Sequence, residues 1–206
     1  MAERRYPCKC CGFWTLSDPQ QGSYEVCPVC YWEDDDIQNE DPELAGGANQ
    51  VCLSAARLNY LRYGACEQEF VGHVRPPRLD EFPPTRVLDG LEKPEYLREQ
   101  KIQILALARC IRHGIIGIAE GSREIAALTS NLGQPELETA LVMFVGIASD
   151  LDDVLIIGKP RDLWNQQALA VLDGQVAEYE SRVKGRVFMA CQTVETLVKN
   201  DLLAAG

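Results

Sequence analysis

The chain has 206 residues, of which 46% are apolar and 25% charged, and its formal net charge is −11. This composition is typical of a globular protein, and the length allows one large domain or two small ones. The excess of carboxylates argues against a general nucleic-acid surface, which would be basic. It fits a soluble protein or one that docks on a basic partner.

The N-terminus, MAERRYPC, contains no apolar run of the kind found in secretory signal peptides. The longest apolar stretches, such as ALVMFVGIA at 140–148, are too short to span a bilayer. We therefore expect a cytoplasmic protein with no membrane contact. Thiols stay reduced in that compartment, so a disulfide framework is not expected.

The first chemical motif is a pair of CxxC turns, Cys8-x2-Cys11 and Cys27-x2-Cys30, separated by 15 residues. This spacing predicts a four-cysteine zinc site, because each turn brings two thiolates to one ion and two turns complete a tetrahedron. Gly12 permits the unusual backbone angles that such a turn needs. Four thiolates leave no open coordination position, so we expect one structural Zn²⁺ that cannot activate water.

A third thiol, Cys10, lies inside the first of these turns. Ligation by Cys8 and Cys11 preserves the CxxC spacing, so we expect Cys10 to be a spare thiol, and its exchange with one of them stays open. Two alternatives to zinc are four unliganded thiols and a thioredoxin-like redox pair. The redox pair would need a βαβ pattern, which the sequence lacks.

The segment YWEDDDIQNEDPE at 31–43 holds seven acidic residues, among them Asp34, Asp35 and Asp36. We consider these three residues part of a surface that binds a basic partner. The simpler interpretation is a solvated loop that caps the metal-binding module. The run lacks the EF-hand calcium pattern. Trp32 is expected to pack over the metal-binding loop.

Two regular elements are expected in this part of the chain. Tyr24–Val26 is a candidate strand that enters the second cysteine pair. A helix is expected over 55–63, with Ser54 as its N-cap and Gly64 as its C-terminal stop.

Several segments resemble the bacterial cysteine-rich CPCC family, in the same order, over residues 5–77. They are YPCKCCGFWTL, GSYEVCPVCYWEDD, DPELAGGANQVCLSAARLNYLRYGA and VRPP. The chain departs from the family name at Lys9, where the name has proline, and Lys9 is not a ligand position. The resemblance implies a zinc-ribbon-like module without an established enzymatic activity, in a family associated with small bacterial proteins, some of them found near toxin or secretion systems.

The segment VRPPRLDEFPPTRVLDGLEKP at 74–94 contains two Pro-Pro pairs and predicts a connector between domains. We expect a fold of the α+β class that is mostly α. It comprises a zinc-ribbon-like module with one helix at 1–75, a proline-rich connector at 76–94 and a helical bundle at 95–206.

The C-terminal part has apolar residues at helical spacing and predicts a bundle of four main helices. The last helix repeats apolar residues at spacings of three and four from Leu172 to Leu197, and Gly174 and Gly185 predict a bend within it. The other expected elements are a helix over 95–111, a helix over 115–132 capped by Gly133, and a helix opened by Pro135. We identify no named family for this part.

The segment joining the last two helices, at 149–164, brings together charged and aromatic residues. A contact surface for a partner is one interpretation, because Trp and Arg dominate interface hot spots. Paired carboxylates also permit acid–base chemistry, but both histidines lie elsewhere. A third interpretation is an acidic loop tied down by a salt bridge from its arginine. The residues concerned are Asp150, Asp152, Asp153, Arg161 and Trp164.

We therefore expect a non-enzymatic zinc-binding protein that binds and neutralises a protein partner. The specific version is an immunity protein against a basic bacterial toxin or effector domain, since an acidic inhibitor gains association rate and complementarity. The alternative is a nucleic-acid- or transcription-associated zinc ribbon. Its basic and aromatic face would be formed by residues near the first CxxC turn, namely Arg4, Arg5, Lys9 and Trp14. An enzyme that uses the Asp150–Asp153 loop is the third hypothesis.

Overall fold

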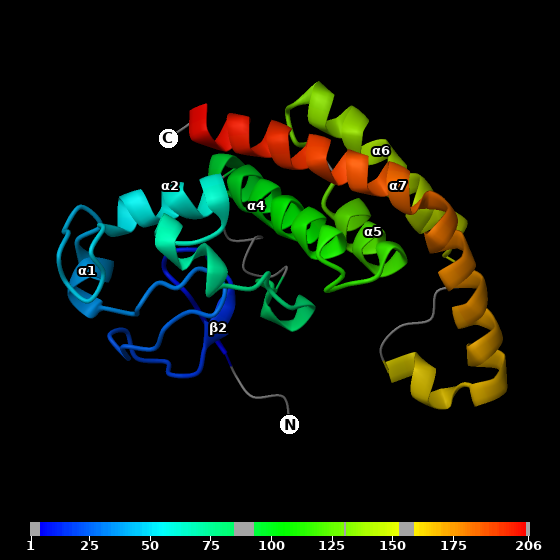
Figure 1. Ribbon diagram of the computed structural model, residues 1–206, viewed down its shortest axis with the longest axis horizontal. Helices are drawn as coiled ribbons and strands as arrows, with labels where there is room; N and C mark the ends of the chain where they lie inside the picture. The colour runs from blue at the N-terminus through cyan, green and yellow to red at the C-terminus, as the bar shows by residue number, and fades with distance from the viewer. Residues whose placement is uncertain (1–4, 85–92, 130, 153–158, 205–206) are drawn as a thin grey trace. The chain divides into compact units, whose positions relative to one another are not determined.

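A computed structural model describes residues 5–84, 93–129, 131–152 and 159–204 (Figure 1). The chain divides into two compact units, one formed by Met1–Tyr96 with Asp201–Gly206 and the other by Leu97–Asn200. A small two-stranded sheet lies in the first unit, and the second unit is helical. The predicted fold class, α+β and mostly α, is confirmed.

The first unit has little regular structure. Its elements are β1 (Tyr6–Pro7), β2 (Trp14–Leu16), α1 (Asp36–Glu40), α2 (Leu53–Tyr63), η1 (Gln68–Gly72) and η2 (Leu79–Glu81). β1 and β2 pair antiparallel, with Tyr6 opposite Leu16. Strands of two and three residues do not form a stable sheet alone, so other contacts must hold this unit together.

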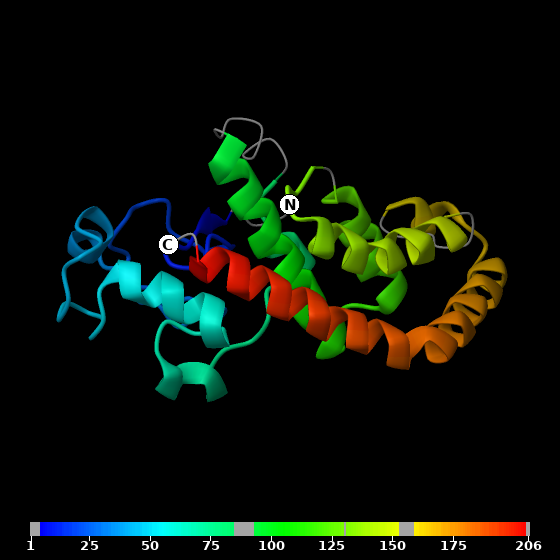
Figure 2. The ribbon, with the colours of Figure 1, turned by 90° about the horizontal axis from the view of Figure 1, so that it is seen from above.

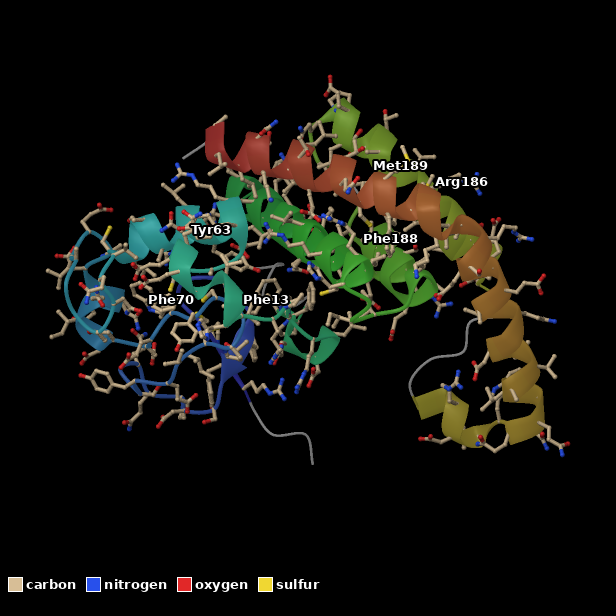
Figure 3. The ribbon with its side chains drawn as sticks, viewed as in Figure 1. Phe13, Tyr63, Phe70, Arg186, Phe188 and Met189 are labelled. Atoms are coloured by element: carbon tan, nitrogen blue, oxygen red, sulfur yellow. The ribbon has the colours of Figure 1, made fainter. Side chains whose placement is uncertain are left out.

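Aromatic side chains contribute to the interior of the first unit. Phe13 and Trp32, each two residues after a cysteine pair, are buried. The Phe13 ring, labelled in Figure 3, meets the Phe82 ring edge to face with centroids 5.0 Å apart. The Tyr60 ring lies 6.4 Å from Phe13. Phe82 belongs to the proline-rich segment predicted as a connector, so this part of the segment packs into the first unit.

Glu81 gives the same segment a second anchor. Its buried carboxylate accepts hydrogen bonds from Arg75 at 2.6 and 2.7 Å and from the backbone N–H of Arg78 at 2.8 Å. Arg5 lies 3.2 Å away. Residues 75–82 are therefore bonded to the first unit, while 85–92 of the predicted connector lie outside the described residues.

The helix predicted over 55–63 is present, and it begins two residues earlier, at Leu53. Gly64 ends it with a left-handed φ of 89°, as predicted. The prediction of Ser54 as N-cap is wrong, because Cys52 occupies the cap position and Ser54 lies in the first turn. The Ser54 hydroxyl instead donates to the carboxylate of Glu43.

Tyr24–Val26 does not form the predicted strand. Within this stretch, Val26 makes an isolated antiparallel bridge with Glu33. Tyr24 has a φ of 56°, in the left-handed region, and this conformation interrupts an extended run.

The four predicted helices are present, and most of their residues belong to the second unit. They are α4 (Lys93–Arg112), α5 (Ile118–Ala127), α6 (Pro135–Asp150) and α7 (Gln166–Ala204), with a short η3 (Lys159–Leu163) before the last. Pro135 occupies the first turn of α6, as predicted. Helices α5 and α6 lie side by side (Figure 2).

Helix α5 is shorter than predicted, since it ends at Ala127 and not near residue 132. The hydroxyl of Thr129 donates to the carbonyl of Ala126, which offers the backbone a turn in place of another helical turn. Gly133 is left-handed, with φ 70°, but lies in the turn before α6 and does not cap α5.

The start of α5 packs closely against the preceding helix through Gly121. A Cβ atom at this position would approach the Ile111 side chain to 2.5 Å, so glycine is required there by packing. The last helix, α7, is curved (Figure 1). The curvature agrees with the bend predicted from Gly174 and Gly185, whose Cβ positions face open space.

Candidate metal centre

The two CxxC turns have the same backbone design. In the first, Gly12 N donates to Cys8 O at 2.9 Å, and Cys8 N donates to Phe13 O at 2.9 Å. In the second, the corresponding bonds run from Tyr31 N to Cys27 O at 2.8 Å and from Cys27 N to Trp32 O at 2.9 Å. Each turn therefore closes on itself and aims its two thiols to one side.

The residue after each turn has a left-handed backbone. Gly12 has φ 81° and Tyr31 has φ 68°. Glycine adopts this conformation freely, whereas an L-residue with a side chain loses about 1–2 kcal/mol. The second turn therefore carries strain that the first turn avoids.

The turns bring Cys8, Cys11, Cys27 and Cys30 together. All four are buried, and their sulfur atoms lie within 4.8 Å of one another. The Cys8–Cys30 and Cys11–Cys27 sulfur pairs are 3.5 and 3.7 Å apart. A disulfide needs about 2.05 Å, so these are free thiols. Four sulfurs about 2.3 Å from one ion would be about 3.8 Å apart along each tetrahedral edge, so the donor set fits such an ion.

Electrostatics favour a cation at this cluster. Burial raises the pKa of the Cys8, Cys11 and Cys30 thiols. Burial acts in the same direction at Cys27, but hydrogen bonds from the other three thiols outweigh it and lower the pKa of Cys27 well below its usual value. Four thiolates in one buried space repel one another, so a bound cation is needed to keep them all deprotonated.

Neighbouring groups support the cluster without belonging to it. Thr15 Oγ1 lies 3.1 Å from the Cys27 sulfur, and the Val29 N–H points at the same atom at 3.4 Å. Cys10 is buried nearby but is not a member of the four-sulfur group among the described residues. The Thr15 contact was not predicted, because a threonine in a short strand carries no distinctive sequence signal.

Helix α2 and the segment after it close the site from outside the turns. Arg57 Nε donates to the carbonyl of Lys9 at 3.0 Å, and Cys66 N donates to the carbonyl of Cys30 at 2.6 Å. Burial raises the pKa of the Cys66 thiol, so it stays protonated and serves as a small apolar side chain.

The acidic segment after the second turn is largely internal. Asp34 is 3% exposed, and its carboxylate accepts hydrogen bonds from the backbone N–H groups of Gly22 and Ser23 and from the Asn39 side chain. Both of its oxygens are therefore bonded within the unit. Asp34 was predicted to face a partner, and the structure corrects that assignment.

Asp35 is 6% exposed and caps α1 by accepting from the N–H groups of Ile37 and Gln38. It also accepts from Ala48 N, and these three backbone hydrogen bonds, the one from Ala48 foremost, lower the pKa of Asp35 against the opposing effect of burial. Asp35 is a second correction, because its carboxylate is bonded internally. Asp36 is exposed, as a surface residue must be.

The candidate residues at 149–164 are spread over separate contacts. Asp150 accepts a hydrogen bond from the Tyr179 hydroxyl at 2.6 Å, and Asp152 pairs with Arg123 at 3.2 Å. Arg161 makes two hydrogen bonds to Asp173, at 2.9 and 2.7 Å. The other two residues are Trp164, which is exposed, and Asp153, which lies outside the described residues.

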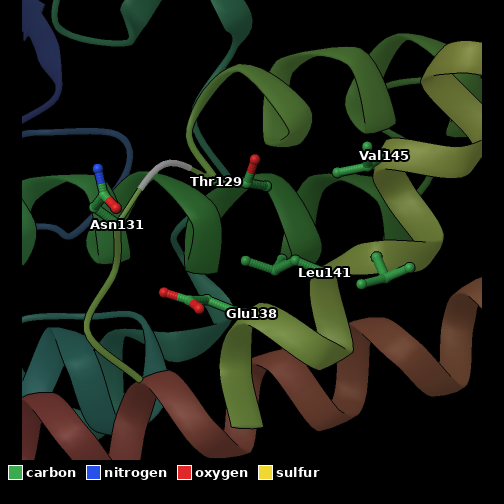
Figure 4. A pocket seen from close by; sticks show the side chains of 6 residues that line it. Thr129, Asn131, Glu138, Leu141 and Val145 are labelled. Atoms are coloured by element: carbon green, nitrogen blue, oxygen red, sulfur yellow. The ribbon is translucent and has the colours of Figure 1, made fainter. Parts of the chain in front are cut away.

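Two of the hollows that described residues border lie in the helical unit. One, of about 290 Å³, is bordered by Thr129, Asn131, Glu138 and the exposed side of α6 (Figure 4). The other, of about 200 Å³, lies beside Asp150, Tyr179 and Arg186. Both are smaller than the 300–1,000 Å³ typical of cofactor pockets.

None of the described helices is both long enough and apolar enough to cross a membrane. A comparison with curated proteins finds no match for the chain. Residues 6–81 match the family described as Cysteine-rich CPCC. The resemblance seen in the sequence is therefore confirmed for the N-terminal part, which holds the four-cysteine cluster, and the helical part has no named family.

Proposed function

We propose that Cys8, Cys11, Cys27 and Cys30 hold one zinc ion that stabilises the first unit. The observation that supports this best is the approach of four buried sulfur atoms to within 4.8 Å of one another. A tetrahedral set of four thiolates is typical of zinc and of iron–sulfur sites, and two CxxC turns around one ion are typical of structural zinc. The ion would neutralise the thiolates and join two turns that share no regular sheet.

Metal analysis of the full chain, purified without added metal, tests this proposal. We expect about one zinc per chain, lost on Cys27→Ser and retained on Cys10→Ser. The second variant is a matched control, because Cys10 is also buried and lies in the first turn. Iron in place of zinc, or loss of metal on Cys10→Ser alone, would contradict the proposed site.

We propose in addition that the protein binds a partner and has no catalytic activity. A closed shell of four thiolates has no position for a water molecule to be activated. The net charge of −11 and exposed carboxylates such as Asp36 and Asp152 favour a basic protein partner through faster association and complementarity. An immunity protein that neutralises a bacterial toxin or effector domain is the specific form of this role.

Affinity capture on the zinc-loaded full chain tests the binding role. We expect a basic protein, retained at physiological salt and released as ionic strength rises. Nucleic acid as the sole partner at that salt would contradict the proposal. Turnover that disappears when Asp150, Asp152 and Asp153 are all replaced by alanine would contradict the non-catalytic part.

A further inference from the structure

Tyr31 occupies a backbone position at which the first turn has a glycine. Its side chain does not fill the interior, since Trp32, the next residue, is buried and takes that place. The Tyr31 ring is half-buried and stacks on Phe70, with ring centroids 4.3 Å apart and planes inclined by 24°. A residue kept in an unfavourable conformation without filling the core indicates a role at the surface.

Several residues around this ring pair are exposed. His73 lies 5.7 Å from Tyr31, and its side chain is exposed. Phe70 itself is half-buried, and the adjacent Val71 is 43% exposed. We name Tyr31, Phe70 and His73 the aromatic platform; Figure 3 shows Phe70 in the first unit.

The segment that carries Phe70 and His73 is negatively charged. The segment at 66–73 contains Glu67 and Glu69 and no lysine or arginine. Glu67 accepts hydrogen bonds from the backbone of Val51 and Gln50. Glu69, next to Phe70, is exposed and forms no ion pair within the described part of the chain.

We propose that the aromatic platform binds an arginine side chain of the protein partner, with the guanidinium over the rings and Glu69 as its hydrogen-bond acceptor. Guanidinium groups stack on aromatic faces and pair with carboxylates in the same plane, which a lysine ammonium does less well. A nucleobase could also stack on the rings, but Glu67 and Glu69 would repel its phosphates. This inference rests on the proposed function, because that function supplies the partner.

An NMR titration of the zinc-loaded full chain with the peptide acetyl-Gly-Arg-Gly-Arg-Gly-amide tests the inference. We expect saturable chemical-shift changes at Tyr31, Phe70 and His73. The changes should be smaller with the same peptide in which lysine replaces each arginine. Tyr31→Gly should weaken binding about fivefold, the size of one exposed cation–π contact, and Glu69→Gln about twofold to fivefold. Tyr31→Gly retains the turn, because glycine suits its backbone.

Tyr24→Gly is the matched control, since Tyr24 also has a positive φ and an exposed ring in the same unit. It should bind the peptide as the wild type does. Unchanged peptide affinity of Tyr31→Gly and Glu69→Gln, equal to that of Tyr24→Gly, would overturn the inference. Tighter binding of a single-stranded RNA oligonucleotide to the same residues would also overturn it.

Failure of this inference is distinguishable from failure of the proposed function. A captured protein partner that binds the wild type, Tyr31→Gly and Glu69→Gln equally would leave the proposed function intact and overturn the platform. Loss of capture with Tyr31→Gly, while zinc content and melting temperature stay unchanged, would support the platform directly.

Discussion

The two units are stabilised by different kinds of interaction. The first unit has strands of two and three residues. Its interior contains a cluster of four thiols and buried carboxylates with distant partners, such as Asp34 bonded to Gly22 and Glu81 paired with Arg5. The second unit relies on apolar side chains of helices, such as Phe144 and Val187. The first unit has little regular structure, so metal ligation and buried, hydrogen-bonded carboxylates take the place of extended apolar packing.

This difference predicts that the two units are destabilised by different changes. Removing the metal or a ligand should affect the first unit, and a core cavity should affect the second. The polar contacts of the first unit should be sensitive to pH, whereas apolar packing is not.

The largest effect is expected from removing the metal. Chelation, or Cys27→Ser, should unfold the first unit, because metal binding supplies on the order of 10 kcal/mol in structural zinc sites of this kind. Hydrogen exchange followed by mass spectrometry should show lost protection in 5–84 and retained protection in α6. Cys10→Ser is the control and should change little. Simultaneous loss of hydrogen-exchange protection in both units would show that they unfold together, which contradicts the expected difference between them.

A cavity in the second unit should have the next largest effect. Phe144 on α6 is fully buried, and Phe144→Ala should lower the free energy of unfolding by about 3–5 kcal/mol. Urea denaturation followed by circular dichroism measures it, and the metal content should stay as in the wild type. Val142→Ala, on the exposed side of the same helix, should cost less than about 0.5 kcal/mol. Equal losses for the two variants would contradict the assigned core.

Glu81→Gln should cost about 2 kcal/mol in the first unit, because it removes the charge that Arg75 and Arg5 share. Asp80→Asn is the matched control. Asp80 contacts the same Arg5 at 3.2 Å but is exposed, so its loss should be near zero. Thermal unfolding of the two variants measures the difference.

The same carboxylate should make stability depend on pH. Burial favours the neutral form of Glu81, but hydrogen bonds from Arg75 and Arg78, with the charges of Arg75 and Arg5, outweigh it and lower its pKa. Its contribution is therefore complete above its unfolded pKa of about 4.3 and is lost as the pH falls below that value. Melting temperature should fall less steeply with acid in Glu81→Gln than in the wild type, and parallel profiles would contradict this role.

The smallest effect concerns the acidic segment. Asp35→Ala should cost about 1 kcal/mol, because it removes the α1 cap and the bond from Ala48. Asp36→Ala, at the exposed neighbouring position, should be nearly neutral. A chemical denaturation series separates the two. A neutral Asp35→Ala would mean that this carboxylate does not contribute to the first unit.

The sequence by itself determined the features that depend on local spacing. Two CxxC turns predicted which four sulfurs would meet, because a turn of this length positions its own thiols. Apolar residues at helical spacing predicted four helices, because the period of 3.6 residues is a local property of the backbone. The stop at Gly64 and the start at Pro135 likewise follow from the conformations that single residues allow.

Only the tertiary structure decided which polar residues are buried. Asp34 and Asp35 have the sequence signature of a solvated loop, but donors at Gly22, Ser23 and Ala48 turn them inward. Likewise, Glu81 and Phe82 lie between the two Pro-Pro pairs of the segment predicted as a connector, and they are held by Arg5 and Phe13. A carboxylate can leave water only where its partners converge, and that convergence is set by contacts between residues far apart in the chain.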